Sequence, residues 1–153
     1  MRNILFMLLA SISISAFAQR TNFSGTWEIN KAKTNFAEAR AAEWVVPRVI
    51  KVDQQAGQLA LTRISTDNQM QDQPAITEVL AFNGTPFQRN SGGTQVTTVL
   101  KWTNDRSFTL DRKGASTAKE SWHLEDDGKA LVIDRSVDTG QGSYSLKCYY
   151  DKK

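Results

Sequence analysis

The sequence has very few of the side chains that form covalent or metal cross-links. Among its 153 residues, one is a cysteine (Cys148) and one is a histidine (His123). A single cysteine excludes an internal disulfide, and this pair is too small a ligand set for a structural zinc site. The acidic pair Asp126-Asp127 lies in a turn and lacks the number of ligands that calcium takes. We therefore expect no metal and no cofactor.

Strong charge and a recognisable catalytic set are also missing. The chain carries 19 basic and 16 acidic residues, a formal net charge of +3, without a run of Lys or Arg. This balance gives no reason to expect a nucleic acid partner. His123 should point outward with Ser121 and Glu125, and no Ser or Cys nucleophile stands at a recognisable distance from it in the sequence. Cys148 is expected to be a buried, inert thiol, so we assign no catalytic residue.

Long apolar runs are confined to the N-terminus. Residues 1–18 have the pattern of a signal peptide: Arg2, an apolar stretch from Ile4 to Ile14, and Ala16-Phe17-Ala18 before Gln19. A membrane anchor is the alternative, but the apolar stretch is too short to span a bilayer and is interrupted by serines. We therefore expect no integral membrane span. The pattern predicts export to the periplasm or the extracellular space and leaves residues 19–153 as one domain.

Period-two alternation of apolar and polar residues covers most of the remaining chain. It predicts about ten strands, near residues 23–29, 48–54, 58–66, 75–82, 85–90, 94–102, 107–113, 117–125, 129–137 and 143–150. Asn83-Gly84 and Asp127-Gly128 are typical two-residue hairpin turns. Because no long helix alternates with these strands, the fold class is all-β, a single antiparallel up-and-down barrel of about 8–10 strands.

The segment from Lys31 to Val46 has a different pattern. Phe36, Arg40 and Trp44 recur every four residues with alanines between them. A short helix across one barrel end is expected here, ended by Pro47. An irregular loop is the alternative.

The hairpin turns determine which charged residues face each other. If Asp127-Gly128 closes its hairpin, Glu120 lies opposite Arg135. By the same argument, Asn83-Gly84 places Glu78 opposite Arg89.

Two further pairings complete the predicted register. Matching Leu61 with Leu80 places Arg63 opposite Glu78, and the hairpin between Trp102 and Phe108 pairs Thr98 with Arg112.

Six charged side chains thus share the inward-facing parity of their strands, and with two tryptophans they form the candidate cavity: Arg63, Glu78, Arg89, Arg112, Glu120, Arg135, Trp102 and Trp122. Four arginines against two glutamates leave two excess positive charges. Buried arginines need an anionic partner, which favours a cavity that binds the acidic group of an amphiphile. Alternatively, bulges or strand ends turn these residues into solvent as ordinary ion pairs.

The chain resembles the small secreted bacterial lipocalin-like proteins, within the calycin group that includes the fatty-acid-binding proteins. The residues that carry the resemblance are Phe23-Ser24-Gly25-Thr26-Trp27, Asn30-Lys31-Ala32-Lys33-Thr34-Asn35-Phe36 and the Trp122 to Leu131 hairpin. It implies a structural Gly25/Trp27 motif at a closed barrel end and binding of a small hydrophobic molecule. In lipocalins this Trp packs under an arginine of the last barrel strand, where this chain offers Lys147.

Three functions follow from these observations. The first is an exported binding protein that holds a small hydrophobic or amphipathic ligand, with or without a carboxylate, in its barrel cavity. The second is a barrel with a filled interior that binds another envelope or extracellular protein through its outer face or loops. The third is an isomerase or hydrolase that uses Glu78 or Glu120 beside an arginine. We rank the enzyme last.

Overall fold

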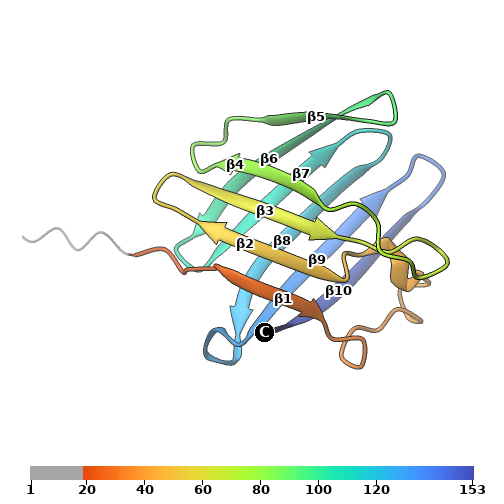
Figure 1. The fold of residues 1–153 in the computed structure, drawn as a ribbon, viewed down its shortest axis with the longest axis horizontal. Coiled ribbons are helices and arrows are strands. Elements are labelled where there is room, and N and C mark those ends of the chain that lie inside the picture. Colours follow the sequence, from red (N-terminus) through yellow and green to blue (C-terminus); the bar gives the residue numbers. More distant parts are fainter. Residues whose placement is uncertain (1–18) are drawn as a thin grey trace, which may run out of the picture.

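The fold is a single antiparallel sheet of ten strands curled into a nearly closed barrel, as the sequence predicts (Figure 1). The computed structural model describes residues 19–153, so the predicted signal peptide lies outside the described residues. The strands are β1 (Gly25–Ile29), β2 (Val49–Gln54), β3 (Gln58–Ile64), β4 (Ile76–Ala81), β5 (Phe87–Ser91), β6 (Thr94–Asn104), β7 (Ser107–Lys113), β8 (Thr117–Glu125), β9 (Ala130–Asp138) and β10 (Ser143–Lys152). Two 3-10 turns, η1 (Glu43–Val45) and η2 (Asp126–Gly128), are the only helical elements of the described chain.

Strands that follow one another in the chain pair with each other, except β4 and β5. The first strand pairs with the last, through Trp27 opposite Lys152. β4 and β5 stand at the two ends of the strand order and share no ladder. The barrel is therefore joined by backbone hydrogen bonds everywhere except along the seam between β4 and β5 (Figure 1).

Two predicted registers are confirmed. On β8 and β9, Glu120 faces Arg135 and Trp122 faces Ile133. On β6 and β7, Thr98 faces Arg112. The tight turn at Asp127-Gly128 explains the first case: both residues have positive φ, 53° and 82°, the backbone that this hairpin turn requires.

The predicted β3–β4 register is wrong by two residues. Leu61 lies opposite Glu78, and Leu59 lies opposite Leu80. The connection between the strands folds on itself instead of extending the ladder. Within it, Thr66 bridges to Asp72 and the Asp67 carboxylate accepts hydrogen bonds from two backbone N–H groups. Because the slip is even, every side chain stays on its predicted face.

The predicted β4–β5 hairpin is also wrong. The Asn83 side chain accepts a hydrogen bond from the Thr85 N–H at 3.0 Å, which forms a local turn. Pro86 follows, and it has no N–H with which to continue a ladder. The two strands therefore diverge after the turn.

The segment after β1 forms one helical turn rather than the predicted helix. The Asn35 side chain caps it by accepting a hydrogen bond from the Glu38 N–H at 3.1 Å. Arg40 then adopts the left-handed conformation (φ 50°), and the Ala41 N–H donates back to the Phe36 carbonyl. The chain continues as an irregular loop to η1, which lies over one end of the barrel (Figure 1).

Aromatic side chains fill the other end of the barrel. Trp27 is fully buried, and its indole N–H donates to the Phe23 carbonyl at 3.0 Å. A Cβ at Gly25 would lie 2.9 Å from Lys152 Cε, so this glycine gives the lysine room to approach. Lys152 places its ammonium 5.2 Å from the Trp27 ring. It takes the position for which the sequence suggested Lys147, whose own ammonium lies near Asp134 at the surface.

Candidate functional site

Six charged side chains from six strands meet inside the barrel at the end covered by η1. Strand alternation brings them there, because each occupies an inward-facing position of its strand. They are Arg63 on β3, Glu78 on β4, Arg89 on β5, Arg112 on β7, Glu120 on β8 and Arg135 on β9. This is the charged part of the predicted set, and the structure brings all of it together.

Glu78 is the best-partnered residue of the cluster and is only 1% exposed. It accepts hydrogen bonds from Arg63 at 2.7 Å, from Arg112 at 2.9 Å and from the Thr98 hydroxyl at 3.0 Å. The Arg89 Nε lies 3.6 Å from Glu78 Oε1, the oxygen that also accepts from Thr98. The predicted contacts of Glu78 with Arg63 and Arg89 are therefore both present.

Glu120 is the second anion of the cluster and is 4% exposed. It accepts hydrogen bonds from Arg63 at 2.8 Å and from the Trp122 indole at 3.1 Å. Arg112 lies 3.5 Å away and the Arg135 Nε lies 3.9 Å away.

Two of the arginines thus contact both glutamates. Arg63 and Arg112 alternate with Glu78 and Glu120 in a closed, electrically neutral ring of four residues, which we call the ion ring. Sequence reasoning missed the ring because its members are brought together by closure of the barrel and not by one hairpin.

The other two arginines lie beside the ion ring. Arg89 approaches Glu78, and Arg135 approaches Glu120 while it donates to the Val45 carbonyl at 2.7 Å. Buried Nε–H groups of Arg89, Arg112 and Arg135 have no hydrogen-bond partner in the described chain.

A hollow of about 160 Å³ opens between these side chains and the η1 segment. All six charged residues line it, together with Val45, Pro47, Ser65 and Ile76. A void of only about 10 Å³ lies deeper, beside Cys148 and Tyr150. Drug-sized ligands occupy roughly 300–1,000 Å³. The hollow therefore suits a small molecule or one end of a larger molecule, and the deeper interior is filled by side chains.

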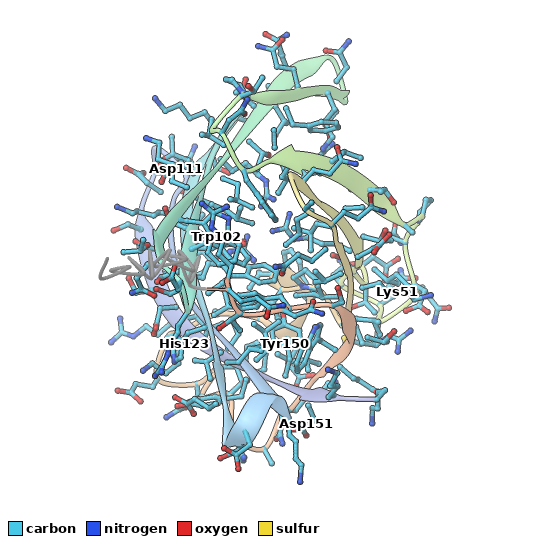
Figure 2. All side chains as sticks on the ribbon, turned by 90° about the vertical axis from the view of Figure 1, so that its left-hand side faces the viewer. Lys51, Trp102, Asp111, His123, Tyr150 and Asp151 are labelled. Carbon is cyan, nitrogen blue, oxygen red and sulfur yellow. The ribbon has the colours of Figure 1, made fainter. Side chains whose placement is uncertain are left out.

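The two tryptophans of the predicted site lie in different places. Trp122 is fully buried beneath Glu120 and stacks on Phe108 with ring centroids 5.3 Å apart. Trp102 packs against Phe23, Phe82 and Phe108 toward the opposite barrel end. Figure 2 shows Trp102 and Tyr150 directed inward, and Lys51 and His123 directed outward.

Several residues of the site were not predicted as members. Thr98 was predicted opposite Arg112, but its hydrogen bond to Glu78 was not foreseen. Val45 and Pro47 close the hollow from the connection between β1 and β2. Pro47 is also held by the Tyr150 hydroxyl, which donates to its carbonyl at 3.0 Å. The sequence pattern predicts that the segment from Lys31 to Val46 crosses one barrel end, but it does not identify Val45 or Pro47 as lining residues.

Burial suppresses ionisation of the two titratable groups beneath the cluster. It raises the pKa of the Cys148 thiol to about 12 and that of the Tyr150 phenol well above 10. A protonated thiol is a poor nucleophile. His123 lies outside, 3.2 Å from Glu125, as predicted.

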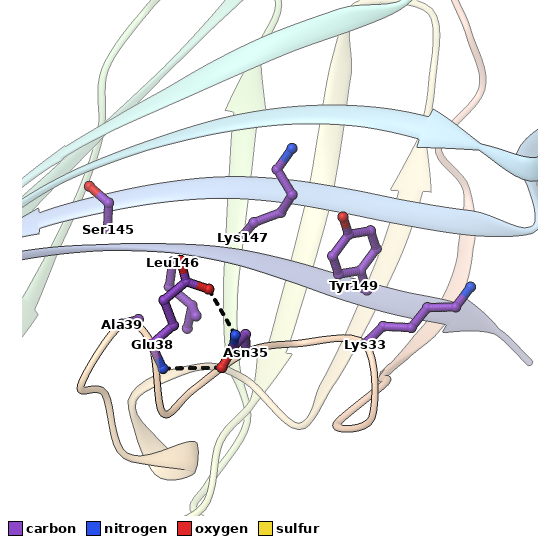
Figure 3. A pocket seen from close by; sticks show the side chains of 8 residues that line it. All are labelled: Lys33, Asn35, Glu38, Ala39, Ser145, Leu146, Lys147 and Tyr149. Atoms are coloured by element: carbon purple, nitrogen blue, oxygen red, sulfur yellow. Dashed lines mark hydrogen bonds between the residues drawn. The ribbon is translucent and has the colours of Figure 1, made fainter.

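A wider and more open hollow of about 490 Å³ lies on the outer surface of β10 (Figure 3). Its wall includes Lys33, Asn35 and Glu38 from the connection after β1, and Lys147 and Tyr149 from β10. Asn35 and Glu38 bind each other there, so these polar groups serve the local turn. The hollow inside the barrel differs, because three buried arginine Nε–H groups there have no hydrogen-bond partner among the described residues.

Residues 19–153 hold neither a candidate metal site nor a candidate membrane-spanning helix. No group of three or more metal-binding side chains is present in this part of the chain. None of its helical segments has the length and apolar character needed to cross a bilayer.

Comparison with known proteins identifies the fold. No protein-family model and no curated protein matches the sequence. Among solved structures, a fatty acid transporter named REP1-NXSQ matches with a TM-score of 0.59 and 13% identity, over 85% of this chain and 95% of that one. Zebrafish ileal bile acid-binding protein, complexed with cholic acid, matches with a TM-score of 0.57 and 15% identity, over 86% and 98%. At these identities the likeness establishes a calycin-type barrel.

Proposed function

We propose that this chain is an exported binding protein that holds a small amphipathic ligand, with an acidic group of the ligand against the buried arginines. The observation that carries the proposal is the excess of guanidinium over carboxylate around a hollow inside the barrel. Such an excess is stabilised by an anion, and guanidiniums suit carboxylate or phosphate oxygens.

The cover of the hollow supports the amphipathic part of the proposal. Val45, Pro47 and Ile76 are apolar and line the hollow alongside the arginines. The two similar structures are a fatty acid transporter and a bile acid-binding protein complexed with cholic acid, and both fatty acids and cholic acid are amphipathic carboxylic acids. A ligand with a longer apolar part would extend past this cover or displace it.

Titration of residues 19–153 with matched acids and alcohols tests this function. Dodecanoate and dodecanol share an apolar chain and differ in charge, and Trp122 reports binding because its indole donates to Glu120. We expect the acid to change the tryptophan fluorescence and the alcohol to bind more weakly. Absence of binding across a panel of amphipathic acids, by fluorescence and by native mass spectrometry, would contradict the proposal.

Export rests on the signal-peptide pattern of residues 1–18. We expect the protein in an extracytoplasmic fraction of its source cells, with a mass that corresponds to a chain beginning at Gln19. A full-length chain in the cytoplasmic fraction would contradict export and leave the binding function intact.

A second candidate function is recognition of another protein through the outer surface. The filled deeper interior and the exposed apolar residue Val79 on the outer face of the edge strand β4 favour it. Capture of one partner from envelope extract by the wild-type protein, but not by a Val79→Lys variant, would support this candidate.

A further inference from the structure

The charges of the cluster divide into a neutral part and a cationic part. Within the ion ring, Arg63 and Arg112 balance Glu78 and Glu120, and each of these arginines is within 3.5 Å of both carboxylates. The ring therefore satisfies its own charges. Arg89 and Arg135 remain, and they account for the two excess positive charges.

These two arginines are also the least strongly paired of the four. The nearest carboxylate oxygen lies 3.6 Å from Arg89 and 3.9 Å from Arg135, and both distances are beyond that of a good charge-assisted hydrogen bond. Their side chains are 25% and 16% exposed, so water screens them only in part. Both line the same hollow.

We propose that the hollow binds a dianion, either a compact dianionic molecule or the dianionic end of a larger one, through Arg89 and Arg135. The inference rests on the proposed function and sharpens it, because it assigns the ligand two negative charges. Two arginines in excess match two charges, and the buried Nε–H groups beside the hollow match several acceptor oxygens. A short dicarboxylate and a phosphate monoester share this chemistry.

The size of the hollow supports a compact anionic group. Its volume of about 160 Å³ is roughly half of the lower limit for drug-sized ligands. The ion ring forms one wall, so a ligand does not need to break the ring in order to reach Arg89 and Arg135.

Matched pairs of anions test the charge requirement on the wild-type protein, residues 19–153, at constant ionic strength. Succinate and butyrate have four carbons each but carry two charges and one. Ethyl phosphate and diethyl phosphate form the corresponding phosphate pair. We expect the dianion of at least one pair to bind at least about tenfold more tightly by calorimetry, because charge-assisted hydrogen bonds are involved. It should also raise the melting temperature. The pair that discriminates distinguishes a dicarboxylate from a phosphate ligand.

Two substitutions and a control then locate the site. Arg89→Met and Arg135→Met should each reduce the preference for the dianion to about twofold or less, since each removes one excess charge. Arg106→Met removes a positive charge from an exposed turn and should keep the wild-type preference. Arg89→Met should leave the melting temperature of the unliganded protein unchanged or higher, which a merely structural arginine would not do.

The possible outcomes separate this inference from the proposed function. Equal affinity for the one-charge and two-charge members of both pairs, or full preference retained in both variants, would overturn the inference. If dodecanoate still binds in that case, the proposed function stands. If no acid of either charge binds, both fail. If dianions bind and amphiphiles do not, the inference stands and the amphipathic part of the proposed function fails.

Discussion

The four buried arginines differ in what their removal should do to the fold. Arg63 donates to both glutamates at 2.7 and 2.8 Å, so it holds two anions that are almost fully buried. Arg89 has one carboxylate contact at 3.6 Å. The sequence pattern places all four arginines in one candidate cavity. The geometry makes Arg63 a structural bridge, and we propose Arg89 and Arg135 as the arginines that bind the ligand.

Removal of the charge of Glu78 should therefore strongly destabilise the fold. Glu78→Gln leaves Arg63, Arg89 and Arg112 without their shared anion in a poorly hydrated site, and we expect a loss of about 3–5 kcal/mol in the free energy of unfolding. Urea denaturation measures it. The matched control is Glu38→Gln, in the exposed turn after β1, which should cost well under 1 kcal/mol. Equal effects of the two substitutions would show that the ion ring does not stabilise the fold.

Trp27 is a second residue whose contribution to the stability of the fold can be measured. It is fully buried, is hydrogen-bonded to Phe23 and is covered by Lys152, so Trp27→Ala should cost about 3–5 kcal/mol. Trp44 is 45% exposed and serves as the control, since Trp44→Ala should have little effect. A melting temperature unchanged by Trp27→Ala would remove Trp27 from the core.

The buried thiol predicts how stability depends on alkaline pH. The folded protein keeps the Cys148 proton up to about pH 12, whereas the unfolded chain loses it near 9.0. Between these values the unfolded state binds fewer protons, so stability falls as pH rises, by up to about 1.4 kcal/mol per pH unit. Tyr150, whose pKa is also raised by burial, acts in the same direction.

Cys148→Ala isolates the contribution of the thiol. The variant should lose less stability between pH 9 and pH 11 than the wild type, as measured by urea denaturation at each pH. The wild-type thiol should react with a thiol reagent only as fast as the protein unfolds. A rapid reaction of the folded protein at pH 8 would show that Cys148 is accessible.

At the scale of elements, the connection after β1 ends its helical turn at Arg40 in the left-handed conformation. This backbone costs a non-glycine residue about 1–2 kcal/mol. Arg40→Gly should therefore raise the free energy of unfolding by up to about 1 kcal/mol, after the greater flexibility of glycine in the unfolded chain is counted. Arg40→Ala removes the same side chain without relief of the backbone, so it should not stabilise. Stabilisation by both variants would assign the effect to the side chain.

The elements also show which features can be predicted from a sequence. Asp127-Gly128 closes a tight hairpin, so its register follows from local chemistry. The β3–β4 register depends on how the polar loop around Asp67 folds, and no alternation pattern encodes that. The expected helix has a real cap at Asn35, but the left-handed backbone at Arg40 ends it after one turn, and the spacing of the apolar residues did not encode that stop.

Part of the candidate site could be predicted, because the alternation along each strand determines which side chains face inward. Strand parity survives an even slip in register, so the inward direction of all six charged residues could be read from the sequence. The contacts of Arg112 with Glu78 and of Arg63 with Glu120 could not be predicted, because they cross the barrel and closure of the whole sheet sets their distances.

At the scale of the whole molecule, side chains close the seam that the backbone leaves open. Glu78 on β4 contacts Arg89 on β5 and Thr98 on β6, so charge-assisted contacts connect the two sides where no ladder forms. The hydrogen bonds that Glu78 accepts from Thr98 and Arg112 therefore hold the barrel closed at the seam, whereas the longer Arg89 contact adds little.

Because of this seam, the two edge strands of the sheet, β4 and β5, are consecutive in the chain, whereas the first and last strands pair inside the sheet. The first and last strands come together where Lys153 donates to the Thr26 carbonyl, while the link between β4 and β5 joins strands that do not pair. A circular permutant with a glycine-serine linker between the native ends and new ends at Asn83-Gly84 should fold with near-native stability. Its β1–β10 contact becomes local, so it should fold faster in stopped-flow experiments. A permutant opened at Asp127-Gly128 separates two paired strands and should be less stable, and the opposite ranking would mean that the seam is not the natural end of the sheet.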